Sequence, residues 1–215
     1  MASDFPGSPK IMKGALVAYQ PPQQSPTVIV FQYNPEHLTR SVSGRPAGGS
    51  GRGDALRTDG PPEETISVAI EIDATDQLET GAGPAAEVGL HPVLAALEGL
   101  LYPALSAVQA NQALAASGGA AILGEPSPLA FFIWGPSRIL PVRITSMSIA
   151  EQAFDTRLNP ILARVDLGLR VMTYRDMETT NPGYWVYWAA FSQKEAMAAR
   201  NPGQSGAAIG TALPL

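Results

Sequence analysis

Two segments of strict alternation constrain the fold of this chain more than any other feature. In segment 63–73, EETISVAIEID, positions 66, 68, 70 and 72 are all isoleucine or valine, and the positions between them are small or polar. Segment 162–172, LARVDLGLRVM, alternates in the same way, with arginine, aspartate and glycine between its valines and leucines. A period of two residues places alternate side chains on opposite faces of a strand, so both segments predict half-buried β-strands. Strands of this kind are typical of antiparallel sheets with one face on a core and one in water.

Further strands are predicted around these two. Apolar runs rich in β-branched and aromatic residues favour strands, and the Asn34-Pro35 pair ends one of them because proline cannot donate to the ladder. A turn at 135–137 predicts a hairpin over 129–145. The apolar phase then changes by one residue near Ser146, which is typical of a β-bulge. The runs are 15–19 (ALVAY), 27–33 (TVIVFQY) and 129–134 (LAFFIW).

Helical spacing occurs twice. Residues 90–101 (LHPVLAALEGLL) form one apolar stripe with proline in the first turn, and a weaker Ala-rich helix is predicted after it, up to Ser117. Asn181 and Pro182 suit the N-cap and N1 positions of a helix that runs to about residue 200. This last helix carries more aromatic area than one narrow face can bury, so we expect it to dock on the domain, to bind another subunit, or to do both. Its aromatic residues are Tyr184, Trp185, Tyr187, Trp188 and Phe191.

The remaining segments predict irregular structure. Residues 41–63 contain glycine and proline with almost no large apolar residue, so we expect a long flexible loop. The domain itself is predicted over 14–175, after an N-terminal extension at 1–13. A C-terminal helical extension at 176–200 and a flexible tail at 201–215 follow it.

Composition argues against several classes of function. The net charge of −5 does not favour nucleic-acid binding, and the absence of cysteine excludes disulfides and thiolate metal sites. Neither of the two histidines, His37 and His91, has a metal-ligand spacing, and the carboxylates that flank segment 65–72, such as Glu64, are interpreted as solvated strand ends. No segment is long and apolar enough to span a membrane. We therefore expect a non-enzymatic cytoplasmic protein without cofactors.

Two motifs resemble the tube-protein domain of contractile injection systems, which are phage-tail-like particles. The first is VIVFQYNPEHLTRS (28–41), and the second lies in PVRITSMSIAEQAFDTRLNPILARVDLGLRVMTY (141–174). They occur in family order on either side of the predicted helix at 90–101, and the resemblance covers roughly residues 14–175. The residues that match are Phe31, Asn34, Pro35 and Glu36 in the first motif and Glu151, Phe154, Leu158, Asn159, Pro160 and Ala163 in the second.

The resemblance implies a mainly β fold, an antiparallel β-sandwich or partly closed barrel with one flanking helix. It also implies a homohexameric ring that joins the spike hub to the inner tube and initiates tube assembly at the baseplate. Its partners would be copies of itself, the spike or hub protein, the inner tube protein or a second tube initiator, and baseplate wedge proteins. Longer members carry a LysM module that is absent here, so the helix with Tyr184, Trp185, Trp188 and Phe191 is the expected replacement contact.

Two other functions fit the pattern. One is the main inner-tube subunit, which is usually compact and lacks the long loop and aromatic helix of this chain. The other is a small monomeric β-barrel that binds a ligand in a cavity lined by its aromatic residues. An enzyme ranks third, because no acid, base and nucleophile can be placed together from the sequence.

Overall fold

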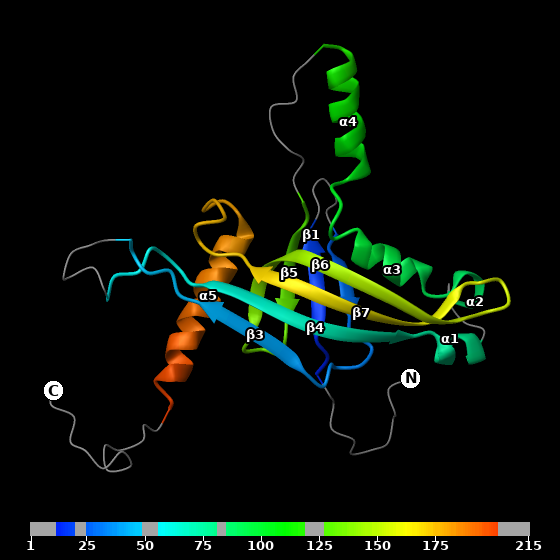
Figure 1. The fold of residues 1–215 in the computed structure, drawn as a ribbon, viewed down its shortest axis with the longest axis horizontal. Helices are drawn as coiled ribbons and strands as arrows, with labels where there is room; N and C mark the ends of the chain where they lie inside the picture. The colour runs from blue at the N-terminus through cyan, green and yellow to red at the C-terminus, as the bar shows by residue number, and fades with distance from the viewer. Residues whose placement is uncertain (1–11, 20–24, 49–55, 81–84, 119–126, 202–215) are drawn as a thin grey trace.

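The protein is mainly β. The computed structural model describes residues 12–19, 25–48, 56–80, 85–118 and 127–201. Seven strands form one antiparallel sheet in the order β2-β1-β5-β6-β7-β4-β3 (Figure 1). The strands are β1 (Ala15–Tyr19), β2 (Thr27–Val30), β3 (Leu38–Ser43), β4 (Glu63–Asp73), β5 (Leu129–Ile133), β6 (Ile139–Phe154) and β7 (Pro160–Val171). The helices are α1 (Thr75–Thr80), α2 (Ala85–Val88), α3 (His91–Glu98), α4 (Leu105–Ala116) and α5 (Pro182–Ala198).

The prediction of antiparallel strands is confirmed, and the prediction of a sandwich or partly closed barrel is replaced by a single open sheet. In the described part of the chain, β2 and β3 each pair with one neighbour only, so the sheet has two edges. The longest strand of this sheet is β6, which runs continuously for 16 residues. Its register against β7 shifts between Ile144 and Ser146, where the bulge was predicted, and the strand continues through this irregularity beside the same partner.

The core lies on one face of this sheet. The alternating valines and isoleucines of β4 pair with those of β7, so that Ile66 faces Leu169 and Ile70 faces Val165 across the ladder. Leu94 and Leu97 of α3 are buried against the same cluster, and so is Tyr187 of α5. Leu90, just before α3, donates its backbone N–H to the carbonyl of Pro160 at the start of β7, whereas Lys194 of α5 contacts Glu64 at the start of β4. The two helices therefore cover opposite ends of one apolar face (Figure 1).

The structure of segment 41–63 differs from the prediction of a long flexible loop. Instead of one long flexible loop, its described residues form β3, the start of β4 and a two-stranded arm between them. Pro46 and Thr58 form an isolated antiparallel bridge, and the N–H of Ala47 donates to the carbonyl of Arg57 at 3.0 Å. Residues 49–55 lie outside the described ranges. The sequence LTRSVS of β3 is polar because this strand lies at an edge and is mostly exposed, so its pairing with β4 gives no hydrophobic signal.

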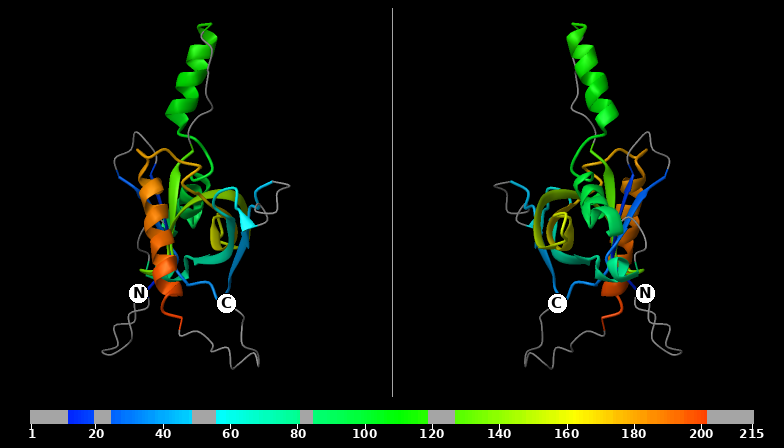
Figure 2. Two further views of the ribbon diagram at one scale, coloured as in Figure 1. Left: turned by 90° about the vertical axis from the view of Figure 1, so that its left-hand side faces the viewer. Right: turned by 90° about the vertical axis from the view of Figure 1, so that its right-hand side faces the viewer.

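Other elements lie close to their predicted bounds. β1, β4, β5 and β7 agree within one or two residues, and β2 ends three residues earlier than predicted because the chain turns after Phe31. β5 is internal in the sheet, and both Phe131 and Phe132 are buried, as its two apolar faces indicate. α4 stands away from the sheet with no buried residue (Figures 1 and 2). In the part of the chain that the structure describes, no helix combines the length and the apolar character needed to span a membrane.

Candidate assembly surfaces

The first motif forms a turn that clamps the start of β1. The side chain of Asn34 accepts a hydrogen bond from the N–H of Gly14 at 2.9 Å and donates one to the carbonyl of Met12 at 2.7 Å. Phe31 is buried, and its ring packs 6.4 Å from that of Phe132. Glu36 is exposed and Pro35 is half-buried. Phe31 and Asn34 thus have a structural role within the chain, and the exposed Glu36 is available to a partner.

The second motif forms the tip of the β6–β7 hairpin. Asp155 closes the tip, because its carboxylate accepts hydrogen bonds from the N–H groups of Arg157 and Asn159 and from the Asn159 amide. The backbone hydrogen bond from Asn159 is the largest of the effects that lower the pKa of Asp155. The amide of Asn159 also donates to the carbonyl of Glu87 at 3.2 Å, which attaches α2 to the tip. The tip is therefore an ordered structure that has a fixed position relative to α2.

This ordered tip presents apolar side chains to solvent. Leu158 is 78% exposed and has a φ of 65°, a conformation that a leucine adopts only at an energetic cost. Phe154 and Glu151 are also exposed, whereas Pro160 is buried. Exposed Phe154 and Leu158 add little to the core, so they are available for contact with another chain.

The aromatic segment forms α5, with the side chain of Asn181 accepting a hydrogen bond from the N–H of Gly183 at the N-cap. Tyr187 faces the core, and burial is the first of the effects that raise its pKa. Trp188 stacks on Tyr174 with a ring separation of 5.1 Å but remains partly exposed, as does Phe191, and Tyr184 is half-buried. Trp185 is 63% exposed. The helix therefore docks on the domain by one face and leaves aromatic area uncovered on another.

Charged side chains hold the C-terminal half of α5 on the sheet. Glu64 is only 5% exposed, so its interpretation as a solvated strand end is wrong. Lys194 of α5 donates to its Oε2 at 2.6 Å. Nε of Arg40 on β3 lies 2.7 Å from Oε1 of Glu64, but Oε1 has no hydrogen bond. The contact between these two side chains is therefore a Coulombic attraction alone. Periodicity could not reveal Glu64, because its partners lie 24 and 130 residues away in the sequence.

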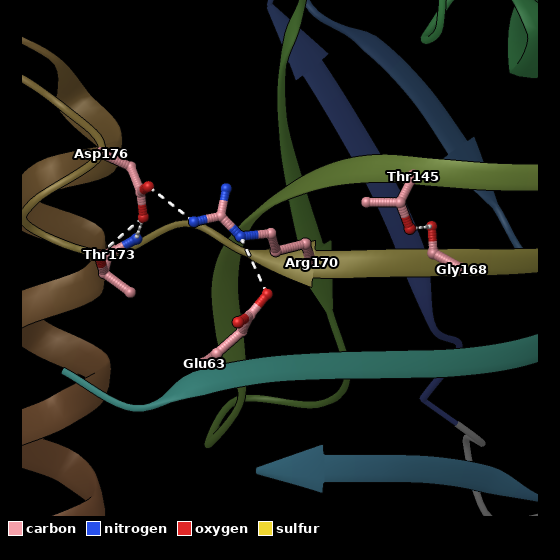
Figure 3. Close-up of polar contacts among 6 residues, drawn as sticks. All are labelled: Glu63, Thr145, Gly168, Arg170, Thr173 and Asp176. Atoms are coloured by element: carbon pink, nitrogen blue, oxygen red, sulfur yellow. Dashed lines mark hydrogen bonds and ion pairs between the residues drawn. The ribbon is translucent and has the colours of Figure 1, made fainter. Parts of the chain in front are cut away.

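A second network connects β4, β7 and the segment that leads to α5 (Figure 3). Arg170 donates to Asp176 at 2.8 Å, and its Nε lies 3.8 Å from Glu63. Asp176 also accepts hydrogen bonds from the N–H and hydroxyl of Thr173. Burial, the largest effect on Asp176, acts to raise its pKa, but the Thr173 bonds and Arg170 together outweigh it and lower the pKa. Arg175 extends the network to the arm through Asp59, whose hydrogen bond raises the pKa of that guanidinium.

The face of the sheet away from the core is polar and composed of small side chains. On β4, β6 and β7 it presents mainly serine, threonine, alanine, glycine and charged residues. The hydroxyl of Thr145 donates across the bulge to the carbonyl of Gly168 (Figure 3). A Cβ at Gly168 would collide with the hydroxyl of Ser146. The strands are thus packed closely here, and the face is a shallow, hydrophilic surface.

The described part of the chain holds no cluster of metal-ligating side chains. Its histidines, aspartates and glutamates form no group of three or more that could hold a metal ion. His37 and His91 are both exposed. A cavity of about 450 Å³ beside the first motif is lined by Tyr33, Asn34, Pro35, Glu36, His37, Ala69, Glu71 and Arg164.

Comparisons with family models and with curated proteins found no match. No protein-family model matches the chain, and no curated protein is significantly similar to it.

Proposed function

We propose that this chain is a structural subunit of a contractile injection system. In this proposal it forms a hexameric ring that joins the spike hub to the inner tube and initiates tube assembly. The proposal rests on the resemblance of residues 28–41 and 141–174 to the tube-protein family, and on how much of the surface is suited to contact with other chains.

The observation that carries it is the pair of edge strands, β2 and β3, which have no second strand neighbour among the described residues. β2 and β3 each have one described neighbour, so the other side of each strand presents backbone N–H and C=O groups that can pair with another chain. Val28 and Val30 of the edge strand β2 are 55% and 56% exposed. Monomeric proteins usually protect edges of this kind with charges, proline or a covering helix. Pairing with neighbours in a closed ring would cover both edges.

Other exposed apolar elements support the same function. α4 buries none of its twelve residues, and Leu105 is largely exposed. The hairpin tip exposes Phe154 and Leu158, and α5 exposes Trp185. These surfaces lie on three separate elements, which suits a subunit with several different partners better than a monomer with one ligand site.

The monomeric β-barrel alternative receives no support from the fold. Its ligand was expected inside a barrel lined by aromatic residues, and the sheet is open, with the aromatic residues of α5 packed around Tyr174. Stoichiometry distinguishes the proposed initiator from a main inner-tube subunit, because the main subunit would be present in many rings.

Purified particles test the proposal. The chain is co-expressed with the spike, tube and baseplate proteins of a contractile injection system, and assembled particles are imaged and analysed by quantitative mass spectrometry. We expect the chain on the tube axis between spike and tube, in one or two rings. Its absence from the particles, or a position away from the axis, would contradict the proposal, whereas many copies along the tube would identify it as the main tube subunit.

A further inference from the structure

A cavity of about 260 Å³ lies between the C-terminal half of α5 and the sheet. Its floor includes Leu140 of β6 and Glu64 of β4, which are both buried. Its roof comes from α5, which lies beside this end of the sheet (Figure 1). An apolar cavity of about 150 Å³ can hold one benzene molecule, and drug-sized ligands occupy pockets of about 300 Å³ or more. The space under α5 therefore suits a small ligand.

Positive charge predominates in the lining of this cavity. The charged side chains of the lining are three cations and one carboxylate, namely Arg40, Arg138, Lys194 and Glu64. Other carboxylates occur at this end of the molecule, but none of them belongs to the lining: they are Asp59, Glu63, Asp176, Glu178 and Glu195. Three of these five contact Arg170 or Arg175 instead. The formal charge of the lining thus favours an anion.

Glu64 is neutralised within the chain and positions two of the cations. Lys194 donates to its Oε2 at 2.6 Å, and Nε of Arg40 lies 2.7 Å from its Oε1. An ammonium has three N–H donors and a guanidinium has five, so Glu64 uses only part of what these cations can donate. Among the described residues no second carboxylate lies within ion-pair distance of either one. Both cations therefore have N–H groups available for another acceptor.

Arg138 is the cation of the lining that has no partner for its side chain among the described residues. It is half-buried, and the N–H of Trp134 donates to its carbonyl at 2.8 Å, which fixes its backbone in the turn before β6. A partly buried charge is costly unless it is paired or hydrogen-bonded. The planar guanidinium matches the two oxygens of a carboxylate with two parallel hydrogen bonds. An anion in the cavity would supply the missing partner.

The remaining lining is largely apolar. Leu140 is buried, Ala190 packs against the core cluster, and the thioether side chain of Met197 is 46% exposed. Ser137 and Gln193 are the neutral polar residues of the lining. A ligand with an apolar body would remove the apolar part of this wall from water, whereas inorganic phosphate would leave it uncovered.

We propose that this cavity binds a small organic carboxylate. The ligand's carboxylate pairs with Arg138 and with the free N–H groups of Arg40, and its apolar body lies against Leu140 and the underside of α5. Glu64 acts only as a positioning residue, because both of its oxygens already lie against cations. The inference goes beyond the proposed role in assembly and does not depend on it.

Matched small molecules test the chemical class of the ligand. The full chain is titrated at low ionic strength with benzoate and with hexanoate, and binding is followed by isothermal titration calorimetry. Benzamide provides the ring without the charge, acetate provides the charge without the apolar body, and inorganic phosphate provides an oxyanion alone. We expect one saturable site for benzoate or hexanoate, and binding weaker by about tenfold or more for the other three compounds, because each lacks part of the contacts.

Variants of one arginine test the position of the site. Arg138→Gln should weaken binding of the carboxylate about tenfold, and Arg138→Lys should weaken it less, because the lysine keeps the charge but loses the planar fork. The control is Arg143→Gln, which removes an exposed arginine of β6 that is not part of this lining and should leave binding unchanged. Circular dichroism and thermal unfolding show that the variants fold. Bound ligand should also raise the unfolding temperature of the wild type but not that of Arg138→Gln.

Four results overturn the inference. The first is a wild-type chain that binds neither benzoate nor hexanoate saturably. The second is benzamide that binds as tightly as benzoate, since the carboxylate then plays no part, and the third is phosphate that binds as tightly, since the apolar wall then plays none. The fourth is an equal loss in Arg138→Gln and Arg143→Gln, which would indicate an effect of total charge. None of these results changes the outcome of the particle experiment above, so the two proposals fail independently.

Discussion

At the scale of single residues, Gly89 shows how one backbone position supports the second motif. Its φ of 59° is favourable only for glycine, and a Cβ there would collide with the carbonyl of Pro160 and lie 2.9 Å from Cβ of Asn159. We expect Gly89→Ala to lower the free energy of unfolding by about 2–3 kcal/mol, from the conformational cost plus the clash. Gly135→Ala is the matched control, because its φ is 73° and its Cβ would meet open space. Urea unfolding measures the free energy of unfolding of both variants. An equal loss in the two would contradict the role of the clash at Gly89.

Asp176 leads to a prediction about how the stability of the protein depends on pH. Its pKa is lowered in the folded protein, so the ionised carboxylate stabilises the fold above the unfolded pKa of about 3.9. This stabilisation should disappear as pH falls through and below that value. We expect Asp176→Asn to lose stability at neutral pH and to show a shallower decline between about pH 5 and pH 3 than the wild type. Thermal unfolding across this range tests it, and parallel pH profiles for the two proteins would contradict it.

At the scale of elements, α5 depends on charge at one end and on aromatic packing at the other. Removing Lys194 leaves the buried Glu64 with only the poorly aligned Arg40, so we expect Lys194→Ala to cost about 1–2 kcal/mol, discounted because the lysine is partly exposed. Glu195→Ala removes an exposed neighbour on the same helix and should cost little. Chemical denaturation gives both values, and limited proteolysis shows whether α5 detaches. If the two substitutions have equal effects, Glu64 does not contribute to the docking of α5.

Elements with a strong periodic pattern could be predicted, and elements stabilised by their neighbours could not. β4 and β7 were evident from sequence because every second residue enters the core. The predicted loop at 41–63 includes the last three residues of β3, because an edge strand with exposed side chains derives its stability from backbone bonds to β4. α1 and α2 were also missed, since helices of six and four residues carry too little periodicity to detect.

At the scale of the whole molecule, the open edges determine the expected behaviour. Val28→Lys with Val30→Lys places charges on the edge strand β2, where both side chains are more than half exposed. We expect this variant to retain the thermal stability of the parent and to lose incorporation into particles, because charged edges resist pairing with another chain. Particle purification after co-expression measures incorporation. A folded variant that is incorporated normally would exclude β2 from the contacts between subunits.

The candidate surfaces show the same division between local and tertiary information. The motif residues were found from the sequence, but the structure gives Phe31, Asn34, Asn159 and Pro160 roles in packing and hydrogen bonding within the chain. Phe154, Leu158 and Trp185 are left exposed for partners. A motif does not separate the residues that stabilise the fold from those that face solvent. That difference depends on which other segments of the chain pack against each side chain.

The alternation of β4 and β7 by itself determined that this chain forms half-buried antiparallel strands, because the period of two is a local property of the backbone. The bulge near Ser146 and the turn at Asn34 were determined in the same way. Only the tertiary structure decided that the strands form one open sheet and that Glu64 is buried between Arg40 and Lys194. These properties depend on contacts between residues far apart in the chain, and no local pattern encodes which distant segments will meet.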